Sequence, residues 1–175
     1  VFDAMRIAYK ERTIEHPNKP AKYWLVGGVI MHFLGAGVWG FIHTLPQVNK
    51  WTHGTQITPA HGHIAFYGAY AMLIIAVIYY ALPRIHFNRD ELDVRRGLWS
   101  FWIITIGVAG MVLALTGASV LQVFMERIGG LPFITVQDYM WFFYVLRFIF
   151  GVFTAIGVII FFTDVISPKE ARAAQ

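Results

Sequence analysis

The stretch THGTQITPAHGH, residues 52–63, leads directly into a long apolar segment and carries two histidines, His61 and His63, separated by one glycine. Side chains two residues apart on an α-helix point roughly 200° away from each other around its axis. These two imidazole rings therefore cannot bind one metal ion together, but each can bind a metal on its own flank of the helix. For histidines in an apolar helix beside a large flat cofactor, the expected metal is haem iron.

The helix that carries the two histidines is expected to begin at Thr58 and Pro59, since threonine is a favoured N-cap and proline a favoured first helical residue. Both histidines then lie in the first turns, near one membrane surface. The flanks below them differ, and we expect either flank to accept the edge of a porphyrin. Small residues and a methionine follow on the side of His61, and aromatic residues on the side of His63: Ala65, Gly68 and Met72 against Phe66, Tyr67 and Tyr70.

The composition is that of a membrane protein. Of the 175 residues 57% are hydrophobic and only 14% are charged, which lies outside the usual range for a soluble domain. Crossing roughly 30 Å of hydrocarbon takes about 20 residues of helix. The sequence therefore predicts an all-α integral membrane protein with four transmembrane helices, at residues 23–43, 58–82, 97–125 and 138–164.

The chain contains no cysteine and seven histidines. The absence of cysteine excludes disulfides, iron–sulfur clusters, thiolate-bound zinc and covalently attached c-type haem within these residues. Histidine is therefore the strongest metal-binding side chain that the sequence offers.

The distribution of basic residues predicts the orientation in the membrane. Lysine and arginine gather in segments 1–22, 83–96 and 165–175, whereas the connections 44–57 and 126–137 hold one each. By the positive-inside rule the first three segments are cytoplasmic and the two sparsely charged loops face outward. The net charge of +4 therefore needs no nucleic-acid partner. Segment 1–22 is expected to contain the cytoplasmic end of a helix that starts before Val1.

The first outer loop, 44–57, is rich in neutral hydrogen-bonding side chains, which suit the anionic propionates of haem at a membrane edge. Two further residues inside the predicted helices, one histidine and one arginine, carry expectations of their own. His32 is expected to hydrogen-bond to a neighbouring helix, and Arg147 to pair with a carboxylate from outside this chain. The glycines of the first helix predict close packing against another helix.

Together these motifs resemble the catalytic subunit of bacterial nitric oxide reductases, which belong to the haem-copper oxidase superfamily and use non-haem iron in place of copper. The resemblance runs along the whole chain, and its most specific parts are residues 35–41, 43–46, 52–58, 60–63 and 66–72. The histidine pair alone indicates only the superfamily, whereas the surrounding residues favour the nitric oxide reductase branch.

The resemblance implies roles for individual residues. His61 corresponds to the proximal ligand of the high-spin catalytic haem b3, and His63 to one axial ligand of the low-spin haem b. His53, Thr44 and Asn49 fall where family members support the haem propionates, close to a structural calcium. The family reaction joins two nitric oxide molecules into nitrous oxide and water, with two electrons and two protons.

The resemblance also implies what lies outside these 175 residues. The four helices would be the last four of roughly twelve, and the ligands of the non-haem iron would come from the missing N-terminal helices. Electrons would arrive from a cytochrome c subunit or through a quinol-accepting N-terminal extension. The protein would lie in the bacterial inner membrane as a multi-pass chain in contact with lipid, with its haem ligands near the periplasmic side.

Three alternatives stay open at the level of sequence. An oxygen-reducing haem-copper oxidase subunit would share His61 and His63. A non-catalytic dihaem membrane cytochrome needs two histidines from different helices for each haem, and the only other histidine within a span, His32, lies deeper than His63. A purely structural membrane subunit would need neither histidine for haem.

Overall fold

The computed structural model describes residues 6–7, 10, 18–85 and 94–166. Most of the segment before residue 14, the loop around residue 90 and the tail lie outside these residues, so the expectations for them stay predictions. Within the described part every element is a helix, as the sequence predicts.

Four helical segments of the described residues are long and apolar enough to cross a membrane: Lys19–Thr44, Ile57–Pro83, Val94–Ile128 and Trp141–Ile166. The first consists of α2 (Lys19–His32), a π-helical stretch η1 (Phe33–Trp39) and α3 (Gly40–Thr44). The second consists of α5 (Ile57–Phe66), the π-helical η2 (Tyr67–Ala71) and α6 (Met72–Ile85). The third and fourth are α7 (Val94–Gln122) with η3 (Val123–Ile128), and α9 (Trp141–Ile166).

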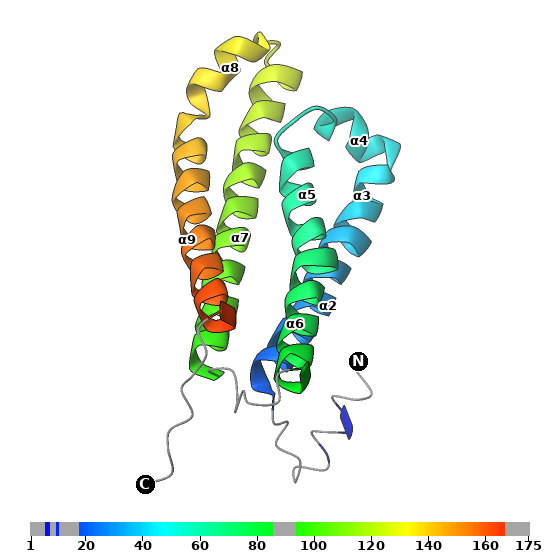
Figure 1. The fold of residues 1–175 in the computed structure, drawn as a ribbon. Helices are drawn as coiled ribbons and strands as arrows, with labels where there is room; N and C mark the ends of the chain where they lie inside the picture. The colour runs from blue at the N-terminus through cyan, green and yellow to red at the C-terminus, as the bar shows by residue number, and fades with distance from the viewer. Residues whose placement is uncertain (1–5, 8–9, 11–17, 86–93, 167–175) are drawn as a thin grey trace, which may run out of the picture.

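The spans form two antiparallel hairpins that stand side by side (Figure 1). Short helices close both hairpins at the same end of the molecule, α4 (Pro46–Thr52) in the first and α8 (Phe133–Tyr139) in the second. The third segment has 35 residues, or about 52 Å of helix, so it is longer than a membrane core and has to tilt or protrude.

Glycines allow the first two spans to pack at backbone distance. A Cβ atom on Gly35 would lie 2.9 Å from the backbone nitrogen of Ala65, and one on Gly68 would lie 2.6 Å from the carbonyl carbon of Met31. Real Cβ atoms do not approach other atoms so closely. The expected close packing of the glycine-rich first helix is therefore confirmed. This packing fixes α5 and η2 against the first span.

The second helix was predicted to end at residue 82, and that bound is wrong. The helix carries Pro83 inside it and continues to Ile85. Proline has no N–H to donate to the carbonyl four residues earlier, here that of Tyr79. Asn18 supplies the missing donor, because its Nδ2 lies 2.7 Å from the Tyr79 oxygen. Its Oδ1 also accepts from the Ala21 backbone at 3.1 Å and so caps α2.

The glycines of the α7–α9 interface give the first test. A Cβ on Gly107 would lie 2.8 Å from the backbone nitrogen of Thr154 and 2.9 Å from the Phe150 oxygen, whereas one on Gly151 meets only the Met111 sulfur at 3.7 Å. We expect Gly107→Ala to lower the free energy of unfolding by about 1–3 kcal/mol, because two backbones must separate. Gly151→Ala is the control and should be neutral or stabilising by up to about 1 kcal/mol. Denaturant titration in detergent measures both, and equal stabilities would contradict the packing.

Candidate metal centre

His61 presents a ring nitrogen that has no hydrogen-bond partner. The atom is Nε2, which is buried and unpaired among the described residues. It lies beside the first span, since a Cβ placed on Gly40 would be 3.4 Å away. An unpaired polar atom in an apolar interior is costly, and binding a metal is one way to remove that cost.

A second histidine, which the sequence did not single out as a site residue, lies against His61. The ring centroids of His43 and His61 are 5.1 Å apart in an edge-to-face arrangement. His43 is held in place by Trp39, whose Nε1 donates a hydrogen bond to His43 Nε2 over 3.0 Å. The i, i+4 spacing of this Trp–His pair on one helix face was the available signal in the sequence.

His63 has one ring nitrogen tied to the backbone of its own helix. Its Nδ1 lies 2.6 Å from the carbonyl oxygen of Pro59. In the tautomer that carries the hydrogen on Nδ1, the ring donates this bond and leaves the lone pair of Nε2 for a metal. Hydrogen bonds of this kind orient metal-binding histidines in general.

The two flanks of α5 differ more than the sequence indicated. Below His61, Ala65 and Gly68 pack directly against the first span, so the pocket expected on this small-residue flank is filled by a helix of the same chain. On the other flank Phe66 and Tyr70 stack at 5.6 Å and are 67% and 61% exposed. This aromatic flank is open along the described residues.

Tyr67 is the exception among the three aromatic residues expected beside His63. It is buried, and its hydroxyl lies 2.9 Å from Thr105 Oγ1 on α7. Successive helix residues are rotated by about 100°, which turns Tyr67 away from Phe66 and toward α7. Tyr67 therefore joins two spans instead of lining the open flank.

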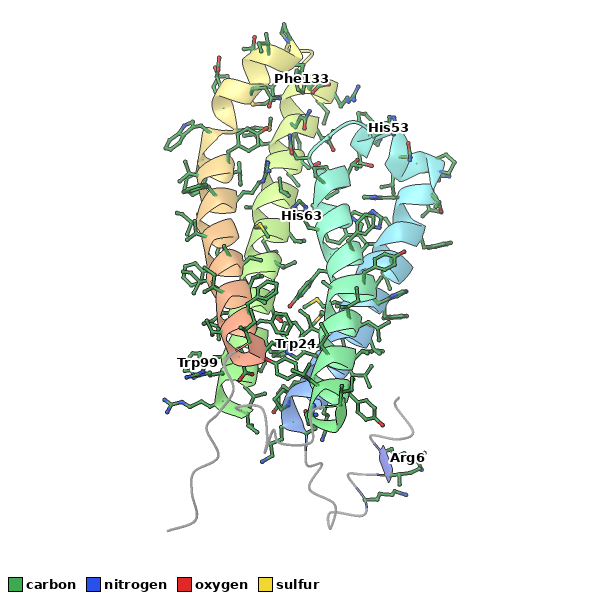
Figure 2. All side chains as sticks on the ribbon, in the orientation of Figure 1. Arg6, Trp24, His53, His63, Trp99 and Phe133 are labelled. Atoms are coloured by element: carbon green, nitrogen blue, oxygen red, sulfur yellow. The ribbon has the colours of Figure 1, made fainter. Side chains whose placement is uncertain are left out.

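The predicted propionate-binding residues do not form one cluster by direct contact. Thr44 donates to the Phe41 carbonyl over 2.7 Å, and Asn49 donates to the His43 carbonyl over 2.9 Å. Both bonds close the end of α3. His53 lies beside α4, at the same end of the molecule (Figure 2), and its carbonyl oxygen accepts from Arg127 over 2.9 Å. Propionate binding by these residues stays a prediction.

Two further polar residues were expected to find partners. His32 is exposed, and its hydrogen bond to a neighbouring helix stays a prediction. Arg147 is likewise exposed on α9. Its pairing with a carboxylate from outside this chain stays a prediction.

Comparison with known proteins decides the family. The family model described as cytochrome c and quinol oxidase polypeptide I matches residues 4–153. The chain belongs to this family. Its members are the haem-copper oxidases, so haem is the general cofactor expected.

Individual members of the haem-copper oxidase family resemble the chain to different degrees. A nitric oxide reductase subunit of Stutzerimonas stutzeri is 46% identical over 166 residues, which cover 91% of this chain and 35% of that protein. A cytochrome c oxidase subunit 1 homolog of Azorhizobium caulinodans is 28% identical over 127 residues, covering 69% of this chain and 23% of that protein. A homolog of the same name from Agrobacterium tumefaciens is 29% identical over 89 residues, covering 50% and 16%. The chain thus spans about a third of the first relative's length.

The bond between Trp39 and His43 gives the second test. We expect Trp39→Phe to lower the free energy of unfolding by about 1–3 kcal/mol, because it leaves the His43 nitrogen without its donor. Trp51→Phe, at an exposed tryptophan of α4, is the matched control and should change it by less than about 0.5 kcal/mol. Chemical denaturation in detergent compares the two variants. Equal effects would show that the His43 bond contributes nothing specific.

Proposed function

We propose that this chain forms part of a membrane-bound nitric oxide reductase, which reduces two molecules of nitric oxide to nitrous oxide and water. One observation carries the proposal: the identity to the nitric oxide reductase subunit of Stutzerimonas stutzeri is 46% along 91% of the chain. The two cytochrome c oxidase homologs are 28% and 29% identical over shorter stretches.

The residues of α5 suit the binding of two haems. His61 offers a buried nitrogen without a partner, and we assign it to the iron of haem b3. His63 is oriented by the Pro59 carbonyl and borders the open aromatic flank, and we assign it to the iron of haem b. The assignment of His61 rests on its unpaired Nε2 atom. The flank beneath the ring gives no further support, because the first span closes it.

When bound, the two haems and a non-haem iron would supply electron transfer and the paired iron sites at which two nitric oxide molecules react. The contribution of this chain is to hold the ligands. Both histidines project from the same ten-residue helix, Ile57–Phe66, so the spacing between their ring nitrogens is set by one rigid element. A fixed spacing would keep the electron-donating haem beside the haem that receives the electron.

The rest of the assembly follows from the same proposal. The described residues contain no group of three or more histidine, cysteine, aspartate or glutamate side chains that could hold a metal ion. As part of the proposal, we assign the ligands of the non-haem iron to helices outside this chain, and we place a structural calcium near the propionates, close to His53. Further helices, a cytochrome c subunit or a quinol-accepting extension, and the bacterial inner membrane complete the assembly, with both ends of this segment cytoplasmic.

A second candidate function is oxygen reduction. It is favoured by the match to cytochrome c oxidase subunit 1 homologs, since such an enzyme would use the same two histidines. A dihaem cytochrome is a less favoured alternative. The backbone of His32 packs against Gly68, which is five residues, or about 7.5 Å of helix, below His63. That offset does not suit two ligands of one haem.

Histidine variants test the haem assignment. In the native assembly purified from membranes, we expect His61→Ala to lose the high-spin haem signal and His63→Ala the low-spin signal, because each removes one imidazole donor. His32→Ala is the matched control and should keep both. Optical and electron paramagnetic resonance spectra read the outcome. Equal haem absorbance in the wild type and the two site variants would refute the assignment, and haem loss in the His32 variant would favour the dihaem cytochrome.

Metal content and gas analysis separate the two reductases. We expect the purified assembly to contain non-haem iron and to produce nitrous oxide from nitric oxide in the presence of an electron donor. The comparison is oxygen consumption by the same preparation. Copper together with rapid oxygen turnover would replace the proposed function by oxygen reduction.

A further inference from the structure

Side chains on one face of the third span hold the segment that leads into α5. Ser119 Oγ lies 2.7 Å from Thr55 Oγ1. One turn further along, the side-chain oxygen of Gln122 accepts a hydrogen bond from the backbone N–H of Gln56 over 3.1 Å. Two neighbouring residues of the segment are therefore bound to two successive turns of α7, which sets their register.

Gln122 is the central member of this set. It is fully buried, with 0% of its surface exposed, and both ends of its amide are used. Its oxygen accepts from Gln56, and its Nε2 donates to Glu126 Oε2 over 2.9 Å. A buried amide inside a membrane segment is costly unless its hydrogen bonds are made. Gln122 therefore needs both of its partners, Gln56 and Glu126, to stay in place.

The same residue of the segment also binds the fourth span. Gln56 Nε2 donates to the hydroxyl of Tyr144 on α9 over 3.0 Å. That hydroxyl in turn donates to Gln137 Oε1 on α8 over 2.7 Å. Gln56 is therefore fixed through its backbone by α7 and through its side chain by α9.

The start of α5 depends on these bonds. The helix begins at Ile57, one residue before the expected N-cap Thr58, and its actual N-cap, Gln56, makes no side-chain capping bond. The exposed ends of a helix need partners for their N–H groups, and here Gln122 supplies one from another span. Gln56 is five residues from His61, about 7.5 Å along the helix axis.

We propose that Gln122 is a positioning residue that fixes the depth and rotation of α5, and with them the two ring nitrogens of His61 and His63. The inference rests on the proposed function, because it takes His61 and His63 to be haem ligands. It does not depend on whether the enzyme reduces nitric oxide or oxygen. A displacement at Gln56 is carried to both histidines because the intervening residues form one helix.

The experiment uses the native assembly purified from membranes. Gln122→Met keeps the length of the side chain and removes both hydrogen bonds. The matched control is Thr116→Val on the same helix, because Thr116 bonds only to the Val112 carbonyl of α7 over 2.7 Å. The rescue is the exchange Gln122→Glu with Glu126→Gln, in which residue 122 still accepts from Gln56 and the bond to residue 126 is reversed.

We expect Gln122→Met to shift the paramagnetic resonance g-values of the low-spin haem and to lower turnover by up to about a hundredfold, as misplacement of reacting groups by about 1 Å can do. Thr116→Val should match the wild type, and the exchange variant should return the g-values to those of the wild type. Where Gln122→Met does not accumulate, Ser119→Ala removes only the Thr55 contact and should give a smaller shift of the same haem.

Unchanged g-values in Gln122→Met would overturn the proposal. A shift that Thr116→Val reproduces would also overturn it, and so would a shift that the exchange variant does not reverse. The haem spectra also separate it from the proposed function. A wild type that shows both haem signals but forms no nitrous oxide would remove the nitric oxide reductase assignment, while the spectra of the variants would still decide the role of Gln122.

Discussion

A polar atom inside a membrane needs a partner, and this constraint governs the structure. Asn18 supplies the donor that Pro83 withholds from the Tyr79 carbonyl, and Gln122 supplies an acceptor for the backbone of Gln56. Among the described side chains, two buried polar atoms stay without a partner, Trp24 Nε1 and His61 Nε2. They differ in chemistry, because an indole nitrogen only donates, whereas an imidazole nitrogen can offer a lone pair to a metal. Only the second is therefore evidence for a metal centre.

The glycines explain why the two flanks of the helix that carries His61 and His63 are unequal. Close contact of Gly35 with Ala65 and of Gly68 with Met31 brings the first span against one flank and closes it. The other flank carries Phe66 and Tyr70, which nothing in the described chain covers. Helix packing within the chain therefore closes one flank and leaves the aromatic flank exposed.

Local pattern was enough to predict the four spans and the placement of His61 and His63 on one helix, because length, hydropathy and the i, i+2 spacing are properties of neighbouring residues. Features that depend on distant contacts were not predictable in this way. Pro83 is tolerated only because Asn18, 65 residues earlier, reaches the orphaned carbonyl. The pocket beneath His61 was expected from small side chains, but small side chains serve equally well for helix packing. Which of the two occurs depends on whether another helix approaches.

The segment from Gln56 to Gly68 is held at two places, and the two histidines lie between them. At one end α7 and α9 bind Gln56 through hydrogen bonds. At the other, Gly68 packs against the backbone of the first span. The distance between residues 56 and 68 is about 18 Å along the axis, and hydrogen bonds at one point with steric contact at the other prevent both sliding and rotation. Two rings on opposite sides of one helix can serve two cofactors only if the helix does not rotate, because any rotation that improves one ring's position worsens the other's.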